Sequence, residues 1–383
     1  MTATSVTFLL SKDPLLEHGG DVEMFRLILG LAAEDFDVSA ICYSPDAGTA
    51  VIDLDGRAVP LTRVRKPAIN PARLLVDALR TRRSLVHVRF DGDDLVAAID
   101  AADPDVFVAE HSYMAESFLR SRHAGVTRLV VNTHVPEALV WRATRGTLGR
   151  IEAPRLVRDE LRVARAADAV ATFDADEAEA FRAQGVAGAQ WLDLRLPPIA
   201  QVDVAATPRR LVLMGTRDWA PNQEAFEHAL RLWPRIADGI EGAELCVIGA
   251  KKTGAPEVAY PAGVRDLGFV DDLHGFLATC RAMIAPIRTG GGVRVKLLDS
   301  IRMGLPVVGT TAAVGSLNRV LDLPVHDDDD AFVAACRLML TDSAAAAAAG
   351  RALFAANQDY WTAGRGRQAV VALVLGRGHG GSS

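Results

Sequence analysis

Three consecutive glycines precede two cations in the segment PIRTGGGVRVKLLDSIRMGLPVVGTT. Gly290, Gly291 and Gly292 lack side chains, so another group can come close to the backbone there, although glycine carries an entropic cost in a folded chain. Arg294 and Lys296 follow within about one helical turn. Helix N-termini already attract anions through free amides and the helix dipole. Two further cations favour a diphosphate; a surface turn with two solvated cations fits these residues alone nearly as well.

The residues on either side of the glycines indicate how this loop is held. Residues 281–287 form an apolar run typical of a buried strand, and apolar residues of helical spacing follow from 293 until Gly304 and Pro306. The run PVVGT then predicts another strand. The segment is therefore expected to be strand, glycine loop, helix and strand, with the loop at the N-terminus of the helix.

Strand-like runs alternate with helical patterns along the whole chain, which predicts parallel sheets covered by helices on both faces. A proline-rich stretch without periodicity, 194–210, predicts an interdomain linker. We expect an α/β protein of two doubly wound, Rossmann-like domains that face each other across a ligand-binding cleft. The strand-like runs are 5–10, 37–43, 105–110, 128–133, 168–173, 209–215, 243–249, 281–287 and 305–310. The expected divisions are an N-terminal acceptor-binding domain over 1–196, a C-terminal nucleotide-binding domain over 209–356, a helix over 357–375 that crosses back to the N-terminal domain, and a disordered tail over 376–383.

Two biased segments predict only local structure. The acidic run 327–330 precedes an apolar helical pattern, so it is expected to cap the N-terminus of a helix. The alanine-rich run 341–350 predicts a helix that ends at Gly350.

Composition excludes several classes of protein. Half of the 383 residues are hydrophobic and the net charge is -6, which indicates a soluble globular protein and argues against general nucleic-acid binding. Four scattered cysteines have no metal or redox spacing, so buried reduced thiols are expected. The four Asp-x-Asp pairs fall in expected loops, and no metal is predicted. The sequence shows no signal peptide or membrane span, so a cytoplasmic location is expected. Dinucleotide, P-loop and nucleophile-elbow motifs are not found in the required context.

The residues 264–317, VRDLGFVDDLHGFLATCRAMIAPIRTGGGVRVKLLDSIRMGLPVVGTTAAVGSL, resemble the donor-binding half of the family 4 glycosyltransferases, which have the GT-B fold. The glycines and cations match a GGGxRxK branch of that family. Upstream, LVLMGTRDWAPNQEAF (211–226) resembles the first strand of the same half and the segment after it. The order and spacing of both segments make the resemblance more specific than any single short motif.

The resemblance implies roles for the loop and its helix. Arg294 and Lys296 would neutralise the donor diphosphate as it leaves, without a metal, while the amides of Gly290 to Gly292 approach the sugar and its phosphate. Asp299 stands where a family glutamate accepts hydrogen bonds from the ribose. Gly291 stands where many members carry another glutamate, so one contact to the donor sugar is missing.

Further donor contacts are implied outside that helix. Arg217 follows the first strand of this half, where the family commonly has phosphate-binding cations. It either replaces one of them or forms a salt bridge with Asp218. Phe269 and Val270, in the GFVDD run, are implied to lie beside the donor.

The N-terminal half resembles the same family. In LSKDPLLEHGGDVEMFRLILGLA, Gly19 and Gly20 are implied to lie close to donor phosphate or acceptor, with a structural turn as the alternative. In VVNTHVPEALVWR, His134 matches a histidine that lines the donor sugar, so it is the first choice for a polar catalytic contact; a capped loop is the alternative. Glu137 completes an H-x-x-E pattern of the branch or caps a helix, and His111 is expected to contact the acceptor.

A basic stretch stands apart from these motifs. From 57 to 89 the chain holds nine cations and one acid, Asp77, within a protein of net charge -6. The helical pattern PARLLVDALRTRR combines leucines with arginines. A solvated face and a surface that meets an anionic acceptor or membrane headgroups both fit. The nine cations are Arg57, Arg63, Arg65, Lys66, Arg73, Arg80, Arg82, Arg83 and Arg89.

Together, the residues and the resemblance predict a metal-independent, hexosyltransferase-like glycosyltransferase. It would use a nucleotide sugar as co-substrate, need no other cofactor, and retain the anomeric configuration. The acceptor is a glycan, a lipid or a small molecule. A nucleotide-sugar 2-epimerase of the same fold and a non-catalytic nucleotide-sugar binding protein stay open as alternatives.

Overall fold

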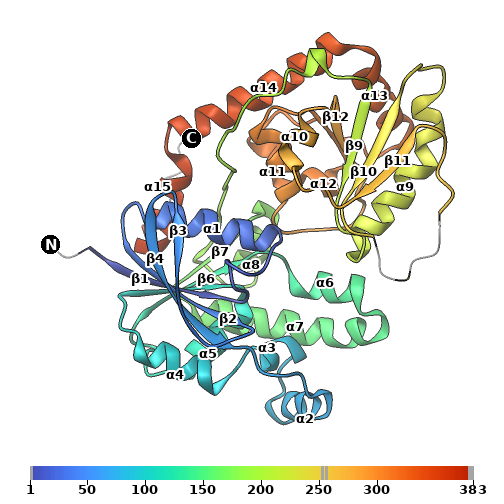
Figure 1. Ribbon diagram of the computed structural model, residues 1–383. Coiled ribbons are helices and arrows are strands. Elements are labelled where there is room, and N and C mark those ends of the chain that lie inside the picture. Colours follow the sequence, from blue (N-terminus) through green and yellow to red (C-terminus); the bar gives the residue numbers. More distant parts are fainter. Residues whose placement is uncertain (1–2, 252–253, 255–257, 378–383) are drawn as a thin grey trace. The chain divides into compact units, whose positions relative to one another are not determined.

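The computed structural model describes residues 3–251, 254 and 258–377 (Figure 1). They form two compact units, each with its own sheet. The first unit joins the N-terminal residues up to Leu194 with those from Arg365 onward, and the second is Arg195–Gly364. The expected α/β architecture with two parallel sheets is confirmed. Of the expected tail over 376–383, residues 378–383 lie outside the described residues.

The sheet of the first unit has the strand order β3-β4-β2-β1-β5-β6-β7-β8, and every described neighbour pair except β3–β4 is parallel. Its strands are β1 (Ser5–Leu10), β2 (Asp37–Ser44), β3 (Gly48–Leu54), β4 (Arg57–Arg65), β5 (Val106–Glu110), β6 (Arg128–Thr133), β7 (Ala169–Thr172) and β8 (Ala189–Trp191). Its helices are α1 (Gly20–Ala32), α2 (Pro71–Thr81), α3 (Leu85–Arg89), α4 (Asp93–Ala101), η1 (Ser112–Met114), α5 (Ala115–Phe118), α6 (Glu137–Thr144), α7 (Gly146–Ala166), α8 (Ala175–Ala183) and α15 (Arg365–Leu375).

The central strands of this sheet are buried on both faces, as continuous apolar runs predict for parallel strands. Leu95 of α4, Phe118 of α5 and Val163 of α7 pack in one core cluster with β1, β2, β5 and β6. Helix α1 lies on the opposite face, beside α15 (Figure 1). The carboxyl ends of β5 and β6 are thereby fixed side by side, in register Glu110 with Asn132.

The hairpin of β3 and β4 is not among the predicted strands. Asp55 and Gly56 form its turn with φ values of 53° and 83°, a conformation that Asp-Gly pairs favour in two-residue hairpins. Burial alternates along β4: Arg57 and Arg65 are exposed, whereas Arg63 is half-buried and pairs with the buried Asp13. The sequence carried the signal for this turn in the dipeptide DG between alternating residues.

The second sheet has five described strands in the order β11-β10-β9-β12-β13, all parallel. They are β9 (Arg210–Met214), β10 (Glu244–Ile248), β11 (Val264–Gly268), β12 (Ala282–Ala285) and β13 (Val307–Gly309). The helices are η2 (Val204–Ala206), α9 (Ala220–Ala237), α10 (Leu273–Leu277), α11 (Val295–Arg302), α12 (Thr311–Val314), η3 (Gly315–Arg319), α13 (Asp329–Thr341) and α14 (Ser343–Thr362). The predicted order of strand, glycine loop, helix and strand is confirmed by β12, α11 and β13.

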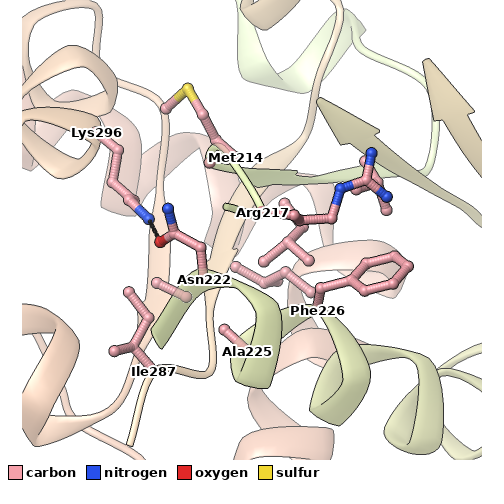
Figure 2. A pocket seen from close by; sticks show the side chains of 12 residues that line it. Met214, Arg217, Asn222, Ala225, Phe226, Ile287 and Lys296 are labelled. Atoms are coloured by element: carbon pink, nitrogen blue, oxygen red, sulfur yellow. Dashed lines mark hydrogen bonds between the residues drawn. The ribbon is translucent and has the colours of Figure 1, made fainter. Parts of the chain in front are cut away.

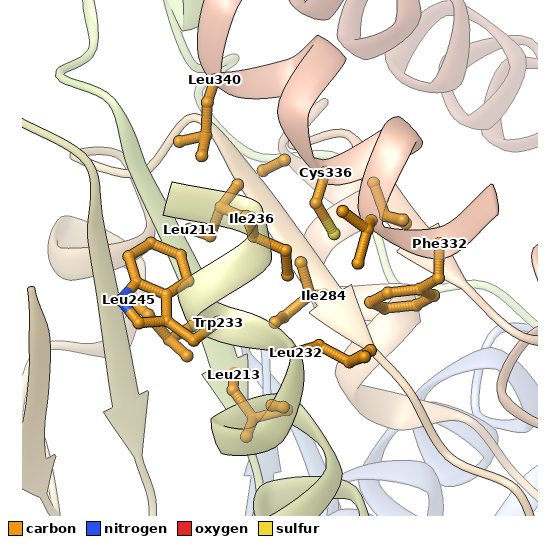
Figure 3. Packing of buried hydrophobic residues seen from close by; sticks show 14 of the residues in the cluster. Leu211, Leu213, Leu232, Trp233, Ile236, Leu245, Ile284, Phe332, Cys336 and Leu340 are labelled. Carbon is orange, nitrogen blue, oxygen red and sulfur yellow. The ribbon is translucent and has the colours of Figure 1, made fainter. Parts of the chain in front are cut away.

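A core under α9 and α13 holds one face of this sheet (Figure 3). Trp233 of α9 is fully buried between Leu211, Leu245 and their neighbours, and its indole nitrogen donates to the carbonyl of Ala262 at 2.8 Å. Phe332 and Cys336 of α13 pack against the same strands. Because this packing fixes α9, it also fixes the position of the first turn of that helix.

The segment after Leu194 packs along α14. Asn357 and Trp361 donate to the carbonyl of Leu196 at 3.1 and 2.9 Å, and the guanidinium of Arg195 lies over the Tyr360 ring. Helix α14 continues through Gly350, so the prediction that this glycine ends the helix is wrong. A Cβ there would overlap the carbonyl oxygen of Gly304, and close approach of two backbones explains the residue.

Three further predictions concern the acidic cap, the cysteines and membrane spans. Asp328 caps α13, accepting from the amides of Asp330 and Ala331, so the acidic cap is confirmed. All four cysteines are buried and free. No single described helix is both long and apolar enough to span a membrane; only α13 and α14 taken together, bent by 101°, meet that length and composition.

Candidate functional site

A pocket lies at the carboxyl ends of β9 and β12 in the second unit (Figure 2). Its floor is apolar, and three polar side chains enter it: Arg217, Asn222 and Lys296. We call it the lysine pocket. Asn222 comes from the first turn of α9 and Lys296 from the first turn of α11, so two helix N-termini converge on it. The remaining lining residues are Leu213, Met214, Gly215, Ala225, Phe226, Val247, Ile284, Ala285 and Ile287.

Lys296 is the cation of this pocket. Its ammonium donates to Asn222 Oδ1 at 2.6 Å, and loss of hydration lowers the pKa of Lys296 to about 8. A lysine with this pKa is still largely protonated at neutral pH, but it lacks a carboxylate partner among the contacts described for it. An anion that enters the pocket would supply the missing counter-charge.

Arg217 has a counter-ion already. Its guanidinium makes a bidentate ion pair with Asp266, at 2.8 and 2.9 Å, and lies over the Phe226 ring. The alternative pairing with Asp218 is therefore wrong. Burial alone would raise the pKa of Asp266, but hydrogen bonds from Arg217, Tyr260 and Lys251 lower it to about 2. Arg217 forms part of the pocket wall as half of a buried ion pair.

Arg294 turns away from Lys296. It precedes the first residue of α11, and its guanidinium donates to the carbonyls of Gly292, at 2.7 Å, and Ala313, at 3.1 Å. Gly292 has φ 75°, the left-handed region that glycine adopts without strain. Arg294 therefore ties the end of the glycine loop to α12.

The glycine loop is also held at its start. Arg288 donates to Asp329 at 2.7 Å, and Thr289 donates to Glu224 at 3.2 Å. Gly290 and Gly291 follow directly, so the free part of the loop is short. The loop is anchored on both sides and presents its own backbone between the anchors.

The other predicted donor-side residues lie on α11 and after β11. Asp299 is buried; its carboxylate is 3.4 Å from His274 Nε2 and 3.6 Å from Arg302, and burial raises its pKa. Phe269, at the carboxyl end of β11, exposes 79% of its surface, and Val270 is half-buried.

In the first unit, the ends of β5 and β6 bring the predicted polar residues together. We call Glu110, His111, Asn132, His134 and Glu137 the histidine cluster. The two imidazole rings are 4.7 Å apart between centroids, and Glu137 Oε1 lies 3.9 Å from His111 Nδ1. All five residues are at least nine-tenths buried.

Burial controls the charges in this cluster. It lowers the pKa of His111 well below its usual range, so that ring is neutral, and it raises the pKa of Glu137 to about 7. Glu160 of α7 accepts the backbone amide of Glu137 at 2.9 Å, and burial raises its pKa to about 8. Glu137 is the first residue of α6, the helix-start position that one of its two predicted roles requires.

The glycines of the first half lie at the start of α1. Gly19 has φ 142° and Gly20 is the first helical residue, so the tight entry into the helix requires glycine at the former position. Phe25 of the same helix packs edge-on against the rings of His111 and His134. The glycine turn, α1 and the histidine cluster are thus parts of one packed arrangement.

Family models match both halves of the chain. Residues 208–342 match the model described as "Glycosyl transferases group 1", and residues 18–192 match the "Glycosyl transferase 4-like domain". The chain belongs to the family 4-like glycosyltransferases of the GT-B fold.

Solved structures share the fold of this glycosyltransferase at low sequence identity. Sucrose-phosphate synthase from Thermosynechococcus elongatus has 16% identity and a TM-score of 0.71, over 98% of this chain and 100% of the other. HepE of Anabaena, solved with UDP and glucose, has 14% identity and a TM-score of 0.62, over 97% of each chain. The catalytic domain of starch synthase IV from Arabidopsis thaliana, bound to ADP and acarbose, has 11% identity and a TM-score of 0.61, over 98% and 100%. Among curated protein sequences, no match to the chain is found.

Two polar residues of the glycosyltransferase were missed by the sequence analysis. Asn222 holds Lys296, and Glu110 holds His134 with 2.5 Å between carboxylate oxygen and Nε2. Asn222 lies within the quoted WAPNQEAF run, and a polar residue at a helix start is a signal that could have identified it. Glu110 was read as the end of an apolar strand, although its neighbour His111 was singled out.

Replacing Gly315 by alanine tests the role of Arg294 without changing Arg294 itself. A Cβ at Gly315 would overlap the Arg294 guanidinium, and φ is 51° there. We expect Gly315→Ala to displace Arg294 and to lower activity as far as Arg294→Ala does. Gly239→Ala is the matched control, because Gly239 also has positive φ (67°) but open space around it. Equal activities of the two glycine variants would contradict the prediction.

Proposed function

We propose that the glycosyltransferase moves a sugar from a nucleoside-diphosphate sugar to an acceptor hydroxyl with retention of the anomeric configuration. The observation that carries this is Lys296: a protonated ammonium without a carboxylate partner in its described contacts, held by Asn222 at the start of α11. The anchored glycine loop precedes the same helix. Both features favour a ligand with a diphosphate.

During the proposed reaction, negative charge develops on the leaving diphosphate, and a nearby cation stabilises it. The bond between the sugar C1 and the diphosphate oxygen breaks, the acceptor oxygen bonds to C1, and the acceptor proton passes to the released nucleoside diphosphate. A fixed ammonium beside the leaving oxygens stabilises that charge more in the transition state than in the bound donor. Structures of HepE with UDP and of starch synthase IV with ADP, both of this fold, support a nucleoside diphosphate as the leaving group.

Product analysis tests the proposal. Purified enzyme is incubated with UDP-, ADP- and GDP-sugars and with mixed glycan and lipid acceptors, and products are identified by mass and by the anomeric coupling constant in proton NMR. A new glycoside with the donor's configuration supports the proposal. A changed sugar without any acceptor would indicate the 2-epimerase, and donor binding without any product would indicate a binding protein.

Activity is expected to survive removal of divalent metal ions. The charge of the leaving diphosphate is opposed by Lys296 and by backbone amides, so the reaction as proposed needs neither a divalent ion nor any other cofactor. Turnover is measured before and after EDTA treatment and again with added Mg²⁺ or Mn²⁺. Loss of turnover in EDTA that either ion restores would refute this prediction.

Helix α2 is the part of the basic stretch that best fits contact with an anionic surface. Within 57–89, Arg63 pairs with Asp13 at 2.7 Å, and Arg83 pairs with Asp91 and Glu116 at 2.8 and 3.1 Å. In α2, by contrast, the single buried residue is Ala78. Exposed arginines at 73, 80 and 82 accompany exposed aliphatic side chains at 75, 76 and 79, and the ion pair of Arg73, with Asp77 at 3.6 Å, lies on the surface of the same helix. We infer that this helix meets an anionic acceptor or the headgroups of a membrane, on its cytoplasmic side.

Replacing Arg73, Arg80 and Arg82 by glutamine is expected to weaken binding to phosphatidylglycerol vesicles by about 1 kcal/mol per arginine. Arg83 stays unchanged because its ion pairs are internal. Vesicle sedimentation at low salt measures the effect, and acceptor KM is measured alongside it. The control replaces three exposed arginines of the second unit, Arg231, Arg265 and Arg351. If both triple variants show equal vesicle binding and equal acceptor KM, the inference is contradicted and α2 is only a solvated face.

A further inference from the structure

We propose that Asn222 is a positioning residue for the transfer reaction: its amide orients the ammonium of Lys296 in the lysine pocket and, being neutral, leaves that positive charge available to a diphosphate. The inference rests on the proposed function and adds to it the group that holds the cation. Asn222 lies in the first turn of α9 and Lys296 in the first turn of α11, and both line the pocket. Figure 2 shows their polar ends pointing toward each other.

The hydrogen bonds of the Asn222 amide determine which of its ends faces the lysine. Its nitrogen Nδ2 donates to the Thr216 carbonyl at 2.9 Å, and its oxygen Oδ1 accepts from Lys296 Nζ at 2.6 Å. Turning the amide over would place Nδ2 against an ammonium, which can only donate, and Oδ1 against a carbonyl oxygen, which can only accept. Both ends are therefore paired only when Oδ1 faces Lys296.

The backbone that accepts from Nδ2 is itself held by the neighbouring strand. On either side of Thr216, the backbone amides of Gly215 and Arg217 donate to carbonyls at and just after the end of β10, both at 3.0 Å. A Cβ at Gly215 would lie 2.7–3.0 Å from the amide atoms of Asn222, so glycine at this position leaves room for that side chain. Asn222 thus connects the end of β10 to Lys296.

Lys296 has no partner of opposite charge among the residues that line the pocket. Arg217 is the other charged lining residue, and it is paired with Asp266. No described contact joins Lys296 to a charged group of the surrounding elements, and Asn222 is the acceptor described for its ammonium. Those groups are Asp218, Glu224, Glu227 and His228 at and before α9, Arg288 and Arg294 of the glycine loop, Asp299 and Arg302 of α11, and Asp329 of α13.

A neutral acceptor orients an ammonium without neutralising it. A carboxylate at position 222 would form an ion pair with Lys296, and an incoming diphosphate would then meet negative charge beside the cation. Asn222 and Lys296 are both half-buried, so the ammonium has lost part of its hydration but stays within reach of a ligand. The arrangement therefore keeps a cation in a fixed place and leaves its counter-charge to the ligand.

The first measurement is the titration of Lys296 itself. The chain has five lysines, so carbon-13 labelling of lysine gives a simple NMR spectrum, and Lys296→Met assigns the signal. We expect Lys296 to titrate near pH 8 in the wild type, about 1–3 pH units higher in Asn222→Asp, and below the wild-type value in Asn222→Leu. Equal values in the wild type and Asn222→Asp overturn the proposal, and this comparison does not require the leucine variant to fold.

Inorganic pyrophosphate tests whether the charge is available to a ligand. Its addition to the wild-type protein should raise the pH at which Lys296 titrates, because a bound anion favours the protonated form. Asn222→Asp should respond less, since the carboxylate already opposes the charge. If pyrophosphate leaves the wild-type titration unchanged, the proposal is wrong. If pyrophosphate shifts it but no donor gives a product, the proposed function fails and the role of Asn222 in holding the cation stands.

Kinetics with the active donor separates positioning from a purely structural role. Both variants should lower kcat/KM by about 10–100-fold, the value of one hydrogen bond to a charged group. The descending limb of the pH profile should move to higher pH in Asn222→Asp and to lower pH in Asn222→Leu. Loss of activity with a limb that stays near pH 8 in both variants would show that Asn222 only supports the fold, while glycosyl transfer stands.

Gln201→Glu is the matched control, because it adds one negative charge at an exposed position of the second unit without changing the size of the side chain. It should keep the wild-type titration of Lys296 and the wild-type pH profile. If Gln201→Glu moves both as far as Asn222→Asp does, the effect comes from net charge and the proposal is overturned.

Discussion

Replacing Lys296 by methionine is expected to lower kcat by about 10²–10³-fold, the usual loss when one fixed donor to a developing negative charge is removed. Methionine keeps most of the apolar stem that lines the lysine pocket, so the change removes the charge with little change in packing. Steady-state kinetics with the active donor measures the loss. Arg351→Met, at an exposed position of α14, is the control and should keep wild-type kinetics.

The same variant should be at least as stable as the wild type at pH 7. Burial lowers the pKa of Lys296 from 10.5 to about 8, so the unfolded chain holds this proton more tightly than the folded one. The resulting penalty to folding is complete below pH 8 and disappears as the pH rises toward 10.5. Methionine carries no such penalty. An unfolding temperature well below wild type would show that the ammonium is structural.

Activity should follow the charge of the same group. In the wild type, kcat/KM is expected to fall as the pH rises through about 8, because the free enzyme loses the cation there. The methionine variant should lack that descending limb. A wild-type profile that stays level from pH 7 to 10, together with near-normal kcat of the variant, would contradict the role assigned to Lys296.

The largest loss of stability is expected for Asp266→Ala, about 3–5 kcal/mol in the free energy of unfolding, because it leaves Arg217 buried without a counter-charge. The guanidinium and the carboxylate are 5% and 3% exposed, so water cannot replace the lost partner. Urea unfolding measures the change. The double variant Arg217→Met with Asp266→Leu should recover much of it, since no charge is then buried.

Acid should reproduce part of this effect in the wild type. Because the pKa of Asp266 is about 2 in the folded protein, below its ordinary 3.8, its contribution is complete above pH 4 and is lost as the pH falls through 2. The double variant should lack this part of the acid dependence. If Asp266→Ala unfolds at the same urea concentration as the wild type, the ion pair contributes nothing to stability.

Apolar periodicity was sufficient to predict the parallel core of both sheets, because a strand buried on both faces must be apolar throughout. It was insufficient for β3, β4, β8 and β11. One exposed face gives β3 and β4 a polar appearance, and β8 and β11 are short edge strands with few buried residues. Gly350 shows a different limit. Its cause is the backbone of Gly304, which lies far away in the sequence, and only the packed structure brings the two together.

The same division holds for the site. The family resemblance and the motifs singled out positions 134, 137 and 296, which the structure places directly after β6, at the start of α6 and in the first turn of α11. Directions of side chains were not predictable. Arg294 was expected to face the donor diphosphate, and Arg217 either to face it or to pair with Asp218, yet Arg294 binds backbone carbonyls and Arg217 pairs with Asp266. Arginine side chains are long enough to reach partners that are distant in the sequence, and the local sequence does not reveal those partners.

The discontinuity of the first unit has a consequence for the order in which the chain folds during synthesis. Helix α15 completes that unit: Arg367 pairs with Asp35 at 2.7 Å, and Arg128 donates to the Val374 carbonyl at 2.9 Å. The ribosome makes the N-terminal partners first and α15 after the entire second unit. The unit whose synthesis begins first is therefore the one that is completed last, and until then the side of α1 that will meet α15 stays uncovered.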